Sequence, residues 1–80
     1  MTNEEIARQL RAQATELALQ GESLYRVRAF RQAAMAVLTQ TTEVAGTLES
    51  HGRKGLERIP GVGRSIAEAI ERICQPSLVS

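Results

Sequence analysis

The chain has 80 residues, a formal net charge of +1, a single cysteine and a single histidine. A chain of this length makes one small domain, and one cysteine excludes an internal disulfide framework. No apolar run is long enough to span a membrane, and the N-terminal residues are acidic rather than basic, unlike a secretion signal. We therefore expect a cytoplasmic protein without a membrane segment.

The charge is unevenly distributed along the chain. Residues 24–64 hold seven basic and three acidic side chains, whereas residues 1–23 sum to −2 and residues 65–80 to −1. A basic middle section between acidic ends is typical of a surface that faces an anion. A solvated helix face would show the same bias, so charge alone leaves both interpretations open.

The composition is rich in Ala, Leu, Glu, Arg and Gln and lacks strand-like alternation, which predicts an all-α fold. A first helix is expected from about Asn3 to Gln20, with Asn3 as its cap and Gly21 as its stop. A second is expected from about Leu24 to Thr39, capped by Ser23. Their inward residues, at helical spacing, are predicted to be Ile6, Leu10, Ala14 and Leu17, and then Leu24, Val27, Phe30, Ala34, Val37 and Leu38.

Thr42 is expected to cap a third helix, from about Glu43 to Ser50, with Val44 and Leu48 inward. Residues 51–55 read as a flexible basic turn that precedes a short extra helix, about residues 54–58.

The last helix is predicted from about Arg64 to Cys74, with Ile66, Ile70 and Ile73 buried, and Pro76 beyond its end. We expect a compact bundle of four main helices plus the short extra helix, in one domain over residues 1–75. Residues 76–80 are expected to form a frayed tail.

The segment Ile59-Pro60-Gly61-Val62-Gly63 is the most specific feature of the sequence. Pro60 removes a backbone donor, and the two glycines permit positive φ or close approach of the main chain. Val62 is expected to plug the turn by packing onto the two helices. Because a helix restarts after Gly63, free N–H groups should point one way and form an anion site; they belong to Gly61, Gly63, Arg64 and Ser65.

Such a site suits a phosphate of the DNA backbone rather than a base edge. Binding should therefore be independent of DNA sequence and strongly dependent on salt. Basic side chains near the site are expected to contribute, although each also fits a solvated or ion-paired role; these are Arg26, Arg53, Lys54 and Arg58.

The pattern apolar-Pro-Gly-apolar-Gly-x-x-apolar-Ala-x-x-apolar, within a hairpin over residues 54–74, resembles the helix-hairpin-helix family of DNA-binding motifs. Together with Gly21 to Ala34 upstream, residues 5–74 are similar to the N-terminal domain of X-family DNA polymerases. This resemblance implies binding to duplex or gapped DNA in repair or replication. It also implies a monovalent cation, K⁺ or Na⁺, held by the backbone carbonyls of Glu57, Ile59 and Val62.

Some members of that family use this domain as a 5′-deoxyribose-phosphate lyase with a lysine nucleophile. The resemblance places that lysine at Ala69 and a second lysine, which helps hold the 5′ phosphate, at Ser65. It places a third, just before the hairpin, at Glu57, an acid that would repel the phosphate. Arg26 keeps the positive charge of a fourth family lysine. A Schiff base requires an amine, which Ala69 lacks, and the only lysine of the chain, Lys54, lies in the turn before the hairpin.

We therefore expect a non-catalytic, monomeric DNA-binding protein that requires no cofactor. The alternative is a protein-interaction module that has kept the helix-hairpin-helix fold.

Overall fold

A computed structural model describes residues 1–75. Within that range the chain forms four helices and no strand: α1 (Asn3–Leu19), α2 (Leu24–Leu38), α3 (Val44–Glu57) and α4 (Arg64–Cys74). The all-α prediction is confirmed, and the bounds of α4 are the predicted ones. The tail expected over residues 76–80 lies outside the described residues. No described helix combines the length and hydropathy needed to cross a membrane.

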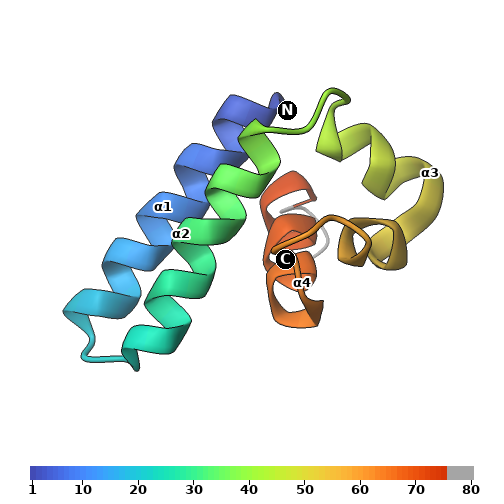
Figure 1. Cartoon of the computed structure of the whole chain (residues 1–80). Coiled ribbons are helices and arrows are strands. Elements are labelled where there is room, and N and C mark those ends of the chain that lie inside the picture. Colours follow the sequence, from blue (N-terminus) through green and yellow to red (C-terminus); the bar gives the residue numbers. More distant parts are fainter. Residues whose placement is uncertain (76–80) are drawn as a thin grey trace.

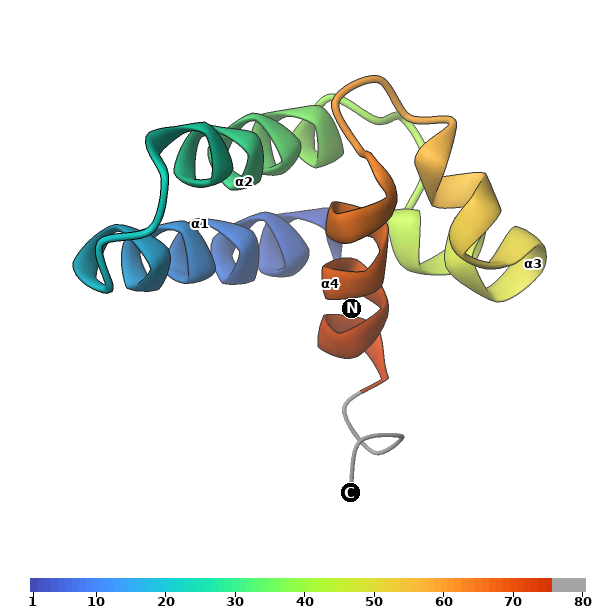
Figure 2. The ribbon, with the colours of Figure 1, turned by 90° about the horizontal axis from the view of Figure 1, so that it is seen from below.

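The four helices form two parts that meet at α4. α1 and α2 lie side by side as an antiparallel pair, and α4 lies between this pair and α3 (Figure 1, Figure 2). The connection between α1 and α2 uses Gly21, which has a positive φ of 76°. Its N–H donates to the Ala18 carbonyl, and the next N–H, of Glu22, donates to the Leu17 carbonyl. These two bonds make a Schellman motif, so the predicted helix stop at Gly21 is confirmed.

The N-cap of α1 is Thr2, and the prediction of Asn3 at this position is wrong. The Thr2 hydroxyl accepts a hydrogen bond from the Glu5 N–H at 3.1 Å, and the Glu5 carboxylate accepts one from the Thr2 N–H at 2.9 Å. This reciprocal pair is a capping box, which satisfies two free donors at once. The bonds from the Thr2 backbone and side chain lower the pKa of Glu5.

Asn3 instead ties the start of α1 to the start of α3. Its Oδ1 accepts from the Val44 N–H at 2.7 Å, its Nδ2 donates to the Thr42 carbonyl at 2.9 Å, and its own N–H donates to Glu43 Oε2 at 2.8 Å. The predicted cap of α3 by Thr42 is therefore wrong. The N-cap position is Glu43, which makes no side-chain capping bond. The Asn3 side chain is available to accept from the Val44 N–H because Thr2 and Glu5 already form the capping bonds at the start of α1.

The core is apolar, with no buried polar or charged residue in the described part of the chain. Most of the predicted inward residues are confirmed as buried: Ile6, Leu10, Ala14, Val27, Phe30, Ala34, Val37, Val44, Leu48, Ile66 and Ile70. Leu17 and Ile73 are half-buried against this core. The prediction is wrong for Leu24 and Leu38, which are 60% and 40% exposed. Both lie on a row of α2 that is offset from the buried residues such as Phe30, so a large part of each side chain stays in solvent.

α3 contains a break at Gly52, where φ is +68° and ψ is −167°. The predicted third helix and the predicted short extra helix are the two halves of this element. The break is confined to one residue rather than spread over residues 51–55. Gly55 lies directly after the break and is buried. A Cβ at Gly55 would come within 2.6 Å of the His51 Cβ, so only glycine allows the second half this approach.

Candidate nucleic-acid interface

The connection between α3 and α4 is a tight turn over residues 59–62. The Val62 N–H donates to the Ile59 carbonyl at 2.9 Å, and Gly61 has a φ of +92°. Proline in the second position and a positive φ in the third are what a type II turn requires. A Cβ at Gly61 would also lie 3.4 Å from the Ala36 Cβ, so the turn runs close to α2.

The hairpin is fixed to the core by apolar side chains on both sides of this turn. Ile59 and Val62 are 8% and 4% exposed, and Ala67 on α4 is fully buried. Val62 thus occupies the position that its predicted role as a plug requires. Because these buried side chains fix the turn on the core, the exposed main chain at Gly61 and Gly63 has a defined conformation.

The first N–H groups of α4 have no acceptor in the described part of the chain. Gly63 is the N-cap and makes no side-chain capping bond. The first backbone bond of the helix runs from the Ala67 N–H to the Gly63 carbonyl, at 2.9 Å. Within residues 1–75 the N–H groups of Gly61, Gly63, Arg64 and Ser65 donate no hydrogen bond. Free donors at the positive end of a helix dipole form an anion-binding site.

Access to these donors is open at Gly63. A Cβ there would meet no atom within 4 Å, and the residue has an ordinary φ of −90°. The glycine is therefore not needed for the backbone conformation. Its absent side chain leaves space directly beside the free N–H groups.

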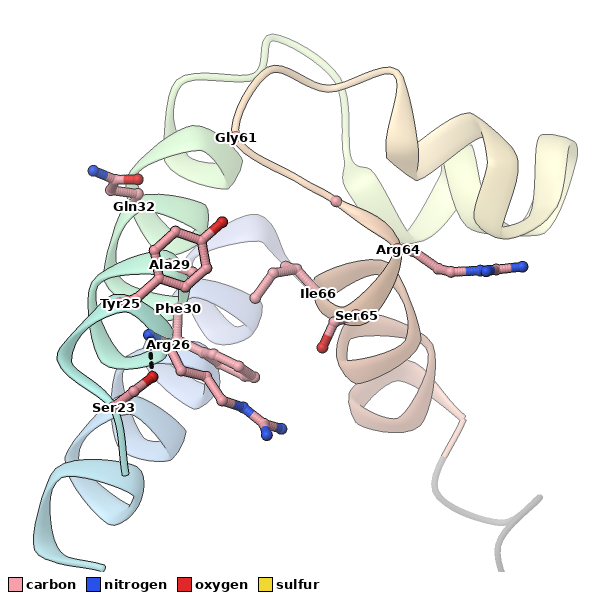
Figure 3. A pocket seen from close by; sticks show the side chains of 11 residues that line it. Ser23, Tyr25, Arg26, Ala29, Phe30, Gln32, Gly61, Arg64, Ser65 and Ile66 are labelled. Atoms are coloured by element: carbon pink, nitrogen blue, oxygen red, sulfur yellow. Dashed lines mark hydrogen bonds between the residues drawn. The ribbon is translucent and has the colours of Figure 1, made fainter. Parts of the chain in front are cut away.

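The same N–H groups border a cleft of about 490 Å³ between α2 and α4 (Figure 3). Among residues 1–75, no acidic residue lines this cleft. The first residues of both helices line it, so the positive ends of two helix dipoles border one space. Its walls are formed by Ser23, Tyr25, Arg26, Ala29, Phe30 and Gln32 from the α2 side, and by Gly61, Gly63, Arg64, Ser65 and Ile66 from the hairpin.

The structure brings five of the predicted site residues to this cleft: Gly61, Gly63, Arg64, Ser65 and Arg26. In Figure 3 the Arg26 guanidinium and the Ser65 hydroxyl point toward the space between α2 and α4. The Arg64 side chain extends away from that space, so Arg64 offers its main chain to the cleft and its charge to the other side of the hairpin. The contributions of Ser23 and Gln32 were not predicted, because the approach of α2 to the hairpin depends on long-range packing.

The other three predicted basic residues lie outside the cleft. Arg53 pairs with Glu68 at 3.1 Å and with Glu71 at 3.6 Å, which joins the second half of α3 to α4. Both pairs are about half exposed, so their contribution to stability is small. Lys54 and Arg58 are exposed, and neither makes an ion pair within residues 1–75.

The three carbonyls implied for a monovalent cation retain free acceptor capacity. Within residues 1–75 the Glu57 and Val62 carbonyls accept no backbone hydrogen bond, and the Ile59 carbonyl accepts one, from the Val62 N–H. Glu57 is the last residue of α3, so its carbonyl is one of the unpaired acceptors of a helix end. Carbonyl oxygens suit a hard cation, and the residues present therefore fit the group.

The positions relevant to a lyase hold no nucleophile. Ala69 is buried, and α4 contains no lysine. The Cys74 thiol is half-buried, and burial raises its pKa. In the described residues no cluster of His, Cys, Asp and Glu side chains is suited to a metal ion.

The fold and the turn thus define a small helical domain that leaves the start of one helix exposed and without a side-chain cap. Residues 1–76 match the family model of the helix-hairpin-helix domain. The match covers nearly the whole chain, and the chain belongs to this family, whose members typically bind nucleic acid. No curated protein and no solved structure matches the chain.

Proposed function

We propose that the protein binds DNA without sequence preference and without catalysis, by holding the sugar-phosphate backbone at the start of α4. The observation that carries this proposal is the set of free N–H groups of Gly63, Arg64 and Ser65 beside a cleft with no acidic lining. Phosphate oxygens accept hydrogen bonds from such groups, whereas base edges are not contacted.

Arg26 and Ser65 supplement the main-chain donors. The Arg26 side chain adds a positive charge from the α2 wall of the cleft, and the Ser65 hydroxyl adds a donor from α4. Glu57, the acid at a position where the polymerase domains carry a lysine, does not line the cleft. Its repulsion of a phosphate therefore acts from outside the site, and Lys54 and Arg58 offset it as solvated charges.

The similarity of residues 5–74 to the N-terminal domain of X-family polymerases favours gapped DNA, in repair or replication, as the setting. In such a complex the carbonyls of Glu57, Ile59 and Val62 would hold K⁺ or Na⁺, and the cation would offset the charge of a nearby phosphate. These carbonyls belong to the main chain. The positions where this chain differs from the polymerase domains, such as Glu57, would therefore not remove the cation site.

The chain is proposed to have no lyase activity, because no amine lies where the family places its nucleophile. Incubation with a duplex containing an abasic site, followed by borohydride reduction, should give no covalent protein–DNA adduct. A lysine-dependent lyase treated in parallel provides the positive control. A trapped adduct that disappears in Lys54→Arg would contradict the assignment and identify Lys54 as the nucleophile.

Salt dependence tests the proposed contacts with phosphate. If two to four phosphates are contacted, the logarithm of the binding constant should fall with the logarithm of salt concentration at a slope of roughly −2 to −4. Gel shifts or anisotropy with duplex, gapped and single-stranded DNA at several salt concentrations give this slope and the preferred substrate.

Gly63→Val provides the sharpest variant for the same assay. The side chain would enter open space beside the free donors, so it should block a phosphate while the bundle stays folded. Gly46→Val is the matched control, because Gly46 on α3 also has no atom within 4 Å of a built Cβ and lies outside the cleft. Circular dichroism checks that both variants are folded. Unchanged affinity in folded Gly63→Val would refute the proposed contact.

A further inference from the structure

The outer face of α2 carries a single row of exposed side chains, which we call the α2 row. It consists of Leu24, Arg28, Arg31, Met35 and Leu38. Their spacings of four, three, four and three residues place them one above another along the helix, as in the seam of a coiled coil. Three of the five are large apolar residues, with exposed fractions of 60% for Leu24, 62% for Met35 and 40% for Leu38.

The described part of the chain leaves much of this row open, since all five residues are exposed. α2 packs on α1 and α4 through other residues, among them Val27, Phe30 and Ala33, which are buried. The hairpin approaches α2 at Ala36, also off the row. The row is therefore an exposed helix face. None of its five residues lines the cleft between α2 and α4, although Arg28 adjoins Tyr25, Ala29 and Gln32, which do.

The charges of the row are also unmatched. Arg28 and Arg31 make no ion pair within residues 1–75, and α2 contains no acidic residue. Two arginines between leucine and methionine side chains would be complemented by carboxylates that flank an apolar stripe.

We propose that the α2 row docks an acidic amphipathic helix of a protein partner. Apolar side chains of the partner at the same alternating spacing would contact Leu24, Met35 and Leu38. Carboxylates beside that stripe would pair with Arg28 and Arg31. The row adjoins the proposed DNA site at Arg28 but shares no residue with it, and the proposal does not depend on that site.

The charges of the row argue against a second copy of the chain as the occupant. Antiparallel pairing of two α2 rows about their centre would set Arg31 against Arg31, and parallel pairing would set both arginines against themselves. Like charges in such a seam are destabilising, and no acid on α2 relieves them. DNA is a poorer fit as well, because a phosphate backbone gives no favourable contact to the three apolar side chains.

The test uses the full 80-residue chain, labelled with ¹⁵N, and a synthetic helical peptide with leucines at four-three spacing and glutamates on both flanks. The control peptide carries lysine in place of every glutamate. Saturable binding of the acidic peptide is expected, with the largest amide shifts over residues 24–38, and the lysine peptide should not bind. Loss of two exposed ion pairs in Arg28→Glu/Arg31→Glu should weaken binding by at least about fivefold.

Two further variants make the test specific. Arg8→Glu/Arg11→Glu reverses two exposed arginines at the same spacing on α1 and should leave peptide binding unchanged. Leu24→Ser/Met35→Ser keeps the charge of the row, so it should abolish peptide binding without changing DNA affinity. The proposal is overturned if the acidic peptide fails to bind, if the lysine peptide binds equally, or if the chain self-associates through this face. It is also overturned if the serine variant loses DNA affinity, which would assign the row to the DNA surface.

Discussion

The two glycines of the hairpin have different roles, although the sequence presents them as a pair. Gly61 has a φ of +92° and lies against Ala36, so its role is to allow the turn and its close approach to α2. Gly63 has an ordinary backbone conformation and open space beside it. A side chain at Gly63 should therefore block access to the free N–H groups without destabilising the fold, whereas one at Gly61 would do both. Gly63 is for this reason the more informative position to substitute.

Asn3 is the second residue whose role appears only in the folded chain. Asn3→Ala should lower the free energy of unfolding by about 1–3 kcal/mol, because the partly buried Val44 N–H loses its acceptor. Thr42→Ala is the control, since the Thr42 side chain makes no hydrogen bond within residues 1–75 and is exposed. Urea denaturation of the two variants measures the difference. Equal stability of Asn3→Ala and Thr42→Ala would contradict the role of Asn3 in joining α1 to α3.

Among the elements, α3 is the one that local signals describe least well. The signals at Gly21, Ser23 and Gly63 act within a few residues, and they place the end of α1 and the starts of α2 and α4 correctly. α3 lacks a local cap and contains the break at Gly52, so its continuity depends on packing against α4 and on Asn3. That dependence explains why the local sequence pattern predicts two separate helices here instead of one interrupted helix.

Substitutions at two glycines of α3 test this description, because they are expected to change the stability of the protein in opposite directions. Gly46→Ala should stabilise the protein by about 0.5–1 kcal/mol, because it improves helix propensity where nothing obstructs a Cβ. Gly55→Ala should destabilise it by about 1–3 kcal/mol, because its Cβ would clash with that of His51, which has no freedom to rotate away. Thermal unfolding of both variants is the measurement. A neutral Gly55→Ala would mean that the two halves of α3 do not approach each other as described.

At the scale of the whole molecule, the sequence predicts the class of fold and the residues of the hairpin, because both follow from local patterns. It does not predict the cleft, since the approach of Arg26 on α2 to Ser65 on α4 arises from packing. The same limit applies to Arg53, whose predicted role near DNA competes with its ion pairs to Glu68 and Glu71. Local signals thus locate the anion site, and tertiary contacts decide which charges surround it.

The molecule also divides its surface between two sets of features. The cleft combines free N–H groups with a basic lining, whereas the α2 row combines apolar side chains with arginines that form no ion pair within residues 1–75. Residues of α2 contribute to both sets but from different faces of the helix, so the proposed DNA site and the proposed docking surface are compatible with each other. A net charge of only +1 fits a contact confined to a few phosphates rather than a broad electrostatic surface.

The most direct measurement of the central claim is an NMR titration of the ¹⁵N-labelled chain with gapped duplex DNA at low and at high salt. We predict that the amide signals of Gly63, Arg64 and Ser65 shift most at low salt and return toward their free positions as salt is added. Amides on the far face of α1 should stay in place under both conditions. If the DNA binds while the three hairpin amides remain unshifted, the start of α4 is not the phosphate site, and the account is contradicted.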